Sequence, residues 1–323
     1  MNSVLKLLYI GGILVFASCV SKTEKQPDIK VNLQNLPDTS KIPHTKLGVE
    51  IRYGLQLFMR TAYYLGPEGK VRQLAGNKMN CKNCHLDAGI RPMSNSLNES
   101  YLKYPQYRPR DGKVLTIEDR INNCFERPMN GKMLPYESRE MRAMVAYMRW
   151  LCEGRVVSFN DDTSHLGTIK LIARAASIEN GAKIYSEFCV KCHGADGQGV
   201  FTADKETYIY PPLWGMNSYA QGSSLHRTVT ASRFVKWSMP YTDHKSPPVL
   251  TDENVFDVVA FLNCDSIHPR PTRDLTKDCP DIEFKPIDFP AGPYLDPYPE
   301  SQHRLGPFKP IKEFYEKRIK TKP

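Results

Sequence analysis

Apolar residues recur at helical spacing in the second half of the chain. Residues 177–188 carry them at four positions, namely Ile178, Ala182, Tyr185 and Phe188. This spacing of three and four residues puts the apolar side chains on one face of a helix. A second helix is predicted to begin after Thr251, because threonine is a good N-cap residue. Its apolar face carries Val255, Val258, Val259 and Leu262.

The first half of the chain repeats this arrangement. The stretches 47–66 and 137–151 also carry apolar residues at helical spacing. The periodicity is lost over 154–168, which marks the join between two units. The sequence therefore predicts an internal duplication, with two helical domains at 46–160 and 161–265 and an all-α fold.

The first residues have the character of an export signal. Lys6 precedes an apolar run from Leu7 to Ala17. This run is shorter than the ~20 residues that a membrane span needs and fits a secretory signal. Because small residues lie directly before Cys19, we predict a lipoprotein signal peptide over 1–19 and a periplasmic protein whose lipid on Cys19 contacts a bacterial membrane. A plain signal peptide and an uncleaved anchor are the alternatives.

Two other segments lack a helical pattern. Residues 20–45 are polar and predict a flexible tether. Much of the proline, 25 residues in all, lies beyond residue 240 and predicts an extended tail over 266–323 that wraps across the domains. The net charge of +9 suits anions or an anionic partner surface. No nucleic-acid partner is expected, because no cluster of Arg and Lys is interleaved with aromatic residues.

Each predicted domain contains one C-x-x-C-H motif, CKNCH at 81–85 and CVKCH at 189–193. Two thiols at this spacing can each add to one vinyl group of a haem, and the histidine then supplies the proximal iron ligand. A zinc half-site or a redox dithiol does not explain a histidine directly after both pairs. The sequence predicts two covalently attached haem c groups, held by Cys81, Cys84 and His85 and by Cys189, Cys192 and His193.

The second haem needs a sixth ligand, and Met239 is the best candidate. It lies 46 residues after His193, is followed by Pro240 and precedes the last helix of the domain. Met216 is the competitor, with a core role as its alternative. Thioether ligation raises the reduction potential and suits electron transfer.

The sixth ligand of the first haem is open from the residues alone. Cys124, Met129 and Met133 lie in the matching region, and spacing makes Met133 a fair choice. After Cys19 and the haem thiols, the nine cysteines leave four, which are Cys124, Cys152, Cys264 and Cys279. In an oxidising compartment these could form two disulfides, Cys124–Cys152 and Cys264–Cys279. Cys124 is therefore either an iron ligand or half of a disulfide.

Three segments carry a resemblance to a known family. LAGNKMNCKNCHLDAG, DRINNCFERPMNGKMLP and KPIDFPAGPYLDPYPESQHRLGPFKPI resemble the dihaem thiosulfate dehydrogenases, the TsdA family, over about residues 46–315. The first domain is also similar to the haem subunit of the Sox thiosulfate-oxidising complex. The resemblance implies two tandem cytochrome c domains that couple two thiosulfates to tetrathionate, or catalyse the reverse reaction. A soluble or membrane cytochrome c or another redox protein would exchange the electrons.

The resemblance also implies roles for individual residues. Cys124 corresponds to the distal ligand of the first haem, opposite His85, and would form a covalent adduct with thiosulfate. Arg110 and Arg120 fall where the family binds its dianionic substrates, and a guanidinium fork suits such oxyanions. Surface or propionate-binding arginines are the alternative. The first haem would be the reaction site, and the second would pass electrons out.

Two residues depart from the family pattern. Pro128 stands where a small hydroxyl residue is expected near the substrate, so one anion contact is missing. Ser238 stands before Met239 where some relatives have a lysine that competes for iron. We therefore predict fixed His193/Met239 ligation.

Other functions compete with this interpretation. A non-catalytic dihaem electron carrier would need two similar haems and no anion site. A dihaem peroxidase would want an acidic calcium site, and the sequence shows no acidic cluster for one. A Sox-type subunit acting on a carrier protein is a closer rival, which the complete second domain and the tail disfavour.

Overall fold

The computed structural model describes residues 37–154, 166–241 and 248–320. The predicted signal peptide with Cys19 lies outside these ranges, as does most of the predicted tether. The described residues fall in one compact unit. The end of the predicted tether belongs to this unit, because Ile42 is fully buried and its carbonyl accepts a hydrogen bond from Arg52. Among the described residues, no helix is both long enough and apolar enough to cross a bilayer.

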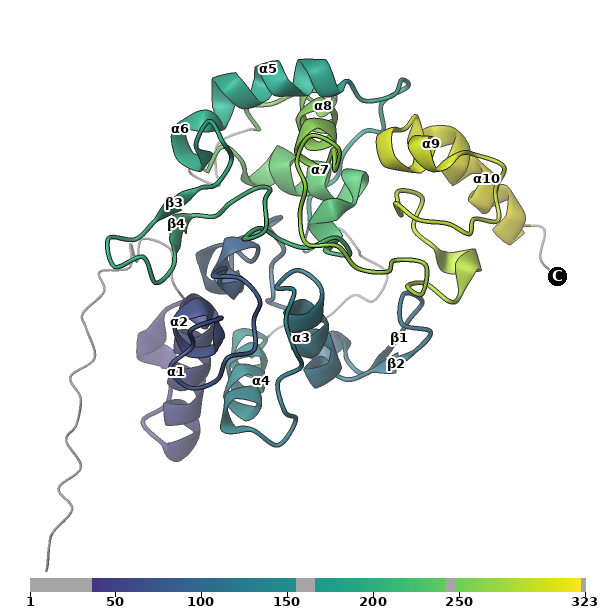
Figure 1. Ribbon diagram of the computed structural model, residues 1–323. Coiled ribbons are helices and arrows are strands. Elements are labelled where there is room, and N and C mark those ends of the chain that lie inside the picture. The colour runs from purple at the N-terminus through teal and green to yellow at the C-terminus, as the bar shows by residue number, and fades with distance from the viewer. Residues whose placement is uncertain (1–36, 155–165, 242–247, 321–323) are drawn as a thin grey trace, which may run out of the picture. The chain divides into compact units, whose positions relative to one another are not determined.

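Two helices packed against each other form the centre of the first domain (Figure 1), and they are α1 (Lys46–Met59) and α4 (Arg139–Leu151). Both begin at a side-chain cap, since Thr45 accepts a hydrogen bond from the Gly48 amide and Ser138 accepts one from the Met141 amide. η1 (Thr39–Lys41) precedes α1. The other helices in the described part of this domain are α2 (Thr61–Leu65), η2 (Cys81–Asn83), η3 (Asp87–Gly89), η4 (Tyr101–Lys103) and α3 (Ile117–Glu126).

The second domain repeats this centre with α5 (Ile178–Phe188) and α8 (Asp252–Leu262). Thr251 caps α8 as predicted, because its side chain accepts a hydrogen bond from the Asn254 amide. The helices between these two are α6 (Val190–His193), η5 (Ser224–His226) and α7 (Thr228–Ser238). The core where they meet contains Ile184, Tyr185, Trp214, Leu250, Val255, Val258 and Leu262.

The structure adds two short antiparallel hairpins to the predicted all-α fold. One pairs β1 (Gln106–Arg108) with β2 (Lys113–Leu115), and the other pairs β3 (Val200–Phe201) with β4 (Tyr208–Tyr210). Strands of two or three residues are too short to show the alternation of apolar and polar positions that predicts a strand. The two hairpins leave the mostly helical class unchanged.

The tail is only partly extended. It contains η6 (Ile282–Phe284), α9 (Glu300–Leu305) and α10 (Phe308–Lys320). Phe308 is fully buried and packs beside Phe256 of the second domain. At its other end the tail reaches the first domain, where the Cys279 amide donates to the carbonyl of Arg110. The tail therefore contacts both domains, as a wrapping segment should.

A glycine allows close helix packing at the centre of each domain. A Cβ atom on Gly54 of α1 would lie 2.0 Å from the carbonyl oxygen of Ala143 in α4. A Cβ atom on Gly181 of α5 would lie 2.0 Å from the carbonyl oxygen of Asp257 in α8. The same backbone contact thus recurs in both halves of the chain, which supports an internal duplication.

We predict that Gly54→Ala and Gly181→Ala each destabilise the protein, because the added methyl group forces two packed helices apart. The expected loss is about 1–3 kcal/mol or more of unfolding free energy, measured by urea unfolding of the haem-loaded protein. Val49→Ala, at a position of α1 that is 56% exposed, is the control and should change little. An unchanged urea midpoint for both glycine variants would contradict this packing.

Candidate functional site

The first C-x-x-C-H motif holds its histidine in a defined orientation. Asn80 and Asn83 form a reciprocal capping box around η2, which fixes the start of the motif. The His85 Nδ1 atom lies 2.6 Å from the carbonyl oxygen of Asn95 and must donate to it, since a carbonyl only accepts. The other ring nitrogen, Nε2, is then left with its lone pair for a metal. This is the arrangement that an iron ligand needs.

Cys124 lies next to His85, on α3, and beside a guanidinium group. Arg120 is one helical turn earlier, and its Nη1 donates to Cys124 Sγ at 3.0 Å. Burial on its own would raise the pKa of the Cys124 thiol, but the charge of Arg120 and the neighbouring His85 hold it lowered, at about 6. Cys124 in turn raises the pKa of Arg120. The structure thus brings together Cys124, Arg120 and His85 around a sulfur that favours the thiolate form.

The neighbouring thiols differ from Cys124. Burial raises the pKa of both Cys81 and Cys84 to about 12. Of the two competing methionines, Met133 is 41% exposed, whereas Met129 is buried at 5% exposure in the core. The contact with His85 therefore singles out Cys124 among the candidates for the sixth position.

Neither of the two alternative disulfides is present, because no cysteine of the described residues forms a disulfide in the structure. Cys152 is buried, and its Sγ donates to the carbonyl of Leu97 instead of meeting Cys124. Cys264 Sγ lies 3.3 Å from the hydroxyl oxygen of Ser266. Cys279 is buried elsewhere in the tail, where its amide meets Arg110. The spacing of cysteines in the sequence could not exclude these disulfides, because residues that flank a loop need not face each other in the fold.

The second C-x-x-C-H motif repeats the geometry of the first. His193 ends α6, and its Nδ1 donates to the carbonyl of Pro211 at 2.8 Å. Burial lowers the pKa of His193, and the neutral ring is the form that ligates a metal. Cys189 is the N-cap residue of the same short helix, and Cys192 lies within it. Backbone carbonyls therefore orient both motif histidines.

Met239 directly follows α7 and is partly buried against an apolar cluster that contains Leu86 and Phe234. Its competitor Met216 is 67% exposed, so it belongs neither to the core nor to an enclosed ligand position. Met239 remains the predicted sixth ligand of the second haem.

Arg110 is tied to the tail. Its Nε and Nη2 donate to Asp278 at 3.2 and 2.6 Å, and Nη2 also donates to the carbonyl of Gly222. Burial lowers the pKa of Arg110 to about 10, with a further contribution from the nearby Arg127. The two guanidinium groups share Asp278, which lies 3.9 Å from Arg127. These hydrogen bonds use Nε and Nη2 of Arg110 and not Nη1.

Sequence reasoning missed the residues that complete this cationic cluster. Arg127 binds Asp111 at 2.6 Å, and Arg273 lies 3.6 Å from Asp278. Asp111 also attracts Arg120, which connects the cluster electrostatically to Cys124. Arg127 lies in the segment DRINNCFERPMNGKMLP, which carries part of the family resemblance. The tail residues Arg273 and Asp278 carried no signal, because their partners lie far away in the sequence.

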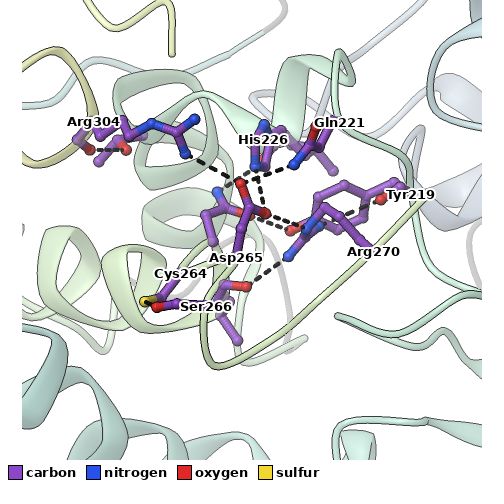
Figure 2. A network of polar contacts seen from close by, with 12 residues as sticks. Tyr219, Gln221, His226, Cys264, Asp265, Ser266, Arg270 and Arg304 are labelled. Carbon is purple, nitrogen blue, oxygen red and sulfur yellow. Dashed lines mark hydrogen bonds and ion pairs between the residues drawn. The ribbon is translucent and has the colours of Figure 1, made fainter. Parts of the chain in front are cut away.

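A buried polar network braces the loop that supplies the Gly222 carbonyl. Figure 2 shows Asp265 at its centre, accepting hydrogen bonds from Gln221, His226 and Arg304 at 3.0, 3.1 and 3.1 Å. Gln221 precedes Gly222, so the network holds the loop from the second-domain side. On the other side, the Ala220 amide donates to the carbonyl of Pro128. Pro128 therefore contributes a backbone acceptor that ties this loop to the first domain.

Comparison with known proteins identifies the two halves separately. Residues 72–157 match the SoxA/TsdA cytochrome c domain, and residues 178–264 match the cytochrome c family. A thiosulfate dehydrogenase of Psychrobacter arcticus is 36% identical over 248 residues, which cover 76% of this chain and 71% of that relative. A thiosulfate dehydrogenase of Allochromatium vinosum is 31% identical over 266 residues, covering 80% of this chain and 91% of that relative. This chain belongs to the thiosulfate dehydrogenase family.

A solved structure agrees with this membership. The as-isolated form of the thiosulfate dehydrogenase TsdBA from Marichromatium purpuratum aligns with a TM-score of 0.64 and 30% identity. The alignment covers 71% of this chain and 48% of that one, so the present chain spans about half of the solved protein. The predicted family and the two tandem cytochrome c domains of this thiosulfate dehydrogenase family member are thereby confirmed.

Two cytochrome c domains carry two covalently attached haem c groups. The residues present fit them, because each motif presents two thiols and a histidine whose Nδ1 is already engaged. Haem iron supplies one-electron redox chemistry at each site. The haem predicted at Cys81 and Cys84 is called the first haem, and the haem predicted at Cys189 and Cys192 is called the second haem.

Proposed function

We propose that the chain couples two thiosulfates oxidatively to tetrathionate, or catalyses the reverse reaction, at the first haem with His85 and Cys124 as its iron ligands. The observation that carries this proposal is the 3.0 Å contact between Arg120 Nη1 and Cys124 Sγ. An iron ligand in an electron carrier has no need of a guanidinium group at its sulfur. A thiolate that reacts with a dianion does need one, because the cation offsets the repulsion between the two negative charges.

The cationic cluster supports an anionic substrate. Arg120, Arg110 and Arg127 are guanidinium groups, which stay charged and match oxyanions with a planar fork. Asp278 holds Arg110 through two nitrogens, so the side chain is fixed before any ligand binds. Such preorganisation lowers the entropy cost of binding. In this proposal Arg120 and Arg110 bind the sulfonate ends of the substrates.

The chemical steps balance through the Cys124 sulfur. The thiolate and the sulfane sulfur of one thiosulfate join in a new S–S bond, and two electrons are released, which the two haems would accept one each. The terminal sulfur of a second thiosulfate then attacks the sulfane sulfur of this adduct. The bond to Cys124 breaks, tetrathionate is released and the thiolate is restored. Arg120 donates to Cys124 Sγ at the start and at the end of the cycle.

The second domain gives the electrons an exit in this proposal. His193 and Met239 ligate the second haem, and thioether ligation raises its reduction potential, which draws electrons away from the reaction site. The acceptor would be a soluble or membrane cytochrome c or another redox protein. The protein is exported to the periplasm, and a lipid on Cys19 would hold it at a bacterial membrane.

The haem-loaded protein is predicted to reduce ferricyanide when thiosulfate is added and to form tetrathionate. Cys124→Ala should lower this rate at least about 1,000-fold, as expected when a group that forms the covalent intermediate is removed. Cys152→Ala, which changes a buried cysteine of the same domain, is the control and should stay active. Absence of activity in the unaltered protein, in both reaction directions, would contradict the proposed function and favour a non-catalytic dihaem electron carrier.

A second prediction concerns Arg110. Arg110→Gln should raise the KM for thiosulfate about 10-fold or more with a smaller change in kcat, because a charged hydrogen bond contributes about 1.5–3 kcal/mol. Arg139→Gln, on the exposed side of α4 where the arginine pairs with Glu50, is the matched control. A KM for Arg110→Gln equal to that of the control would show that Arg110 supports the tail and does not bind substrate.

A further inference from the structure

The residue before Met239 is bonded to the first domain. Ser238 ends α7, and its hydroxyl donates to Ser94 Oγ at 2.8 Å. Both serines are buried, at 1% and 0% exposure. Ser94 passes the hydrogen bond on, since its own hydroxyl donates to the carbonyl of Pro92. The hydroxyl at position 238 therefore points away from the second haem's own domain and into the first.

Neighbouring residues of the same segment also contact the first domain. Met239 packs against the apolar cluster that includes Leu86, the residue directly after the motif histidine His85. Two positions further on, the Tyr241 hydroxyl donates to Asp87 at 2.5 Å. The segment that carries the predicted iron ligand is thus held by residues from the attachment region of the other haem.

The first-domain partner of Ser238 sits beside the group that orients His85. Asn95 follows Ser94 directly, and its carbonyl oxygen accepts the 2.6 Å hydrogen bond from His85 Nδ1. The Asn95 side chain donates to the carbonyl of Cys84, which fixes the same residue to the motif. Asn95 also has a φ of 55°, so its backbone has few alternative conformations that keep this carbonyl in place.

We propose that the Ser238–Ser94 hydrogen bond couples the ligands of the two haems. This hydrogen bond links the residue before Met239 to the residue before Asn95. Met239 is the proposed ligand of the second haem, and the Asn95 carbonyl orients His85, the proposed ligand of the first. Ser238 and Ser94 are positioning residues in this role, because neither needs to touch iron or substrate. The proposal deepens the proposed function, since it rests on His85 and Met239 as iron ligands of the two sites between which electrons pass.

Loss of this hydrogen bond has opposite consequences at the two sites. Methionine ligation raises the reduction potential of a haem, so a loosened Met239 lowers the potential of the second haem. The hydrogen bond from His85 to Asn95 makes the imidazole a stronger donor to iron. A loosened Asn95 therefore raises the potential of the first haem. The two potentials move toward each other, and the driving force for electron exit falls.

The test is an optical redox titration of the haem-loaded protein and three variants, Ser238→Ala, Ser94→Ala and the double variant. The ligation of Met239 is followed through the weak sulfur-to-iron band at the red end of the oxidised spectrum, with Met239→Ala as the reference for its loss. Ser232→Ala is the matched control. Ser232 is a fully buried serine of α7 whose hydroxyl bonds to Val255 within the second domain.

The informative variant is Ser94→Ala, because it changes the first domain only. The expected result is that it weakens the red band and lowers the potential of the second haem as Ser238→Ala does. The double variant should show no larger shift than either single variant, since all three remove one interaction. Ser232→Ala should match the unaltered protein.

Two outcomes would overturn the proposal. One is a Ser94→Ala variant whose second haem keeps the potential and the red band of the unaltered protein. The other is a red band that persists in Met239→Ala, because the coupled ligand would then be a different residue. Both readings come from spectra and potentials. An unaltered protein without thiosulfate activity would contradict the proposed function, but the spectra and potentials of the variants would still test the coupling of the two haem ligands.

Discussion

A buried thiolate needs a positive charge beside it, and this constraint organises the first domain. Burial raises the pKa of the Cys124 thiol, and the charge of Arg120 is the largest influence that opposes it. The two residues lie one helical turn apart on α3, so a single short helix supplies both the sulfur and the guanidinium group. The capping box of Thr116 and Asp119 fixes the start of that helix. The position of the Cys124 sulfur thus depends on local helix geometry.

The surroundings of this pair come from parts of the chain that are distant in sequence. Asp278 of the tail and Gly222 of the second domain both bind Arg110. The Asp265 network holds the Gly222 loop against the tail helix that carries Arg304 (Figure 2). The second cytochrome c domain and the tail therefore both bind residues of the first domain. They complete the cationic surroundings of a site whose sulfur belongs to the first domain.

The sequence was sufficient for features that depend on local spacing. Helical periodicity predicted the paired central helices, Thr251 was identified as a cap, and the two motifs predicted both haem attachments. Features set by distant contacts were out of reach. The carbonyls of Asn95 and Pro211 orient the motif histidines through folded loops. Because every residue has a backbone carbonyl, the sequence does not indicate which one binds a histidine. Asp278 meets Arg110 across 168 positions of the chain, and the burial of Ile42 was hidden in a polar segment.

The most direct test of Cys124 as the reacting sulfur is the mass of its peptide after treatment with one equivalent of thiosulfate per protein and an excess of ferricyanide. The peptide containing Cys124 is expected to gain the mass of one thiosulfate, and the peptide containing Cys152 is expected to gain none. A second addition of thiosulfate should remove the gain and release tetrathionate. Tetrathionate formation with no adduct on Cys124 at any time, or with the adduct on another residue, would contradict the central claim.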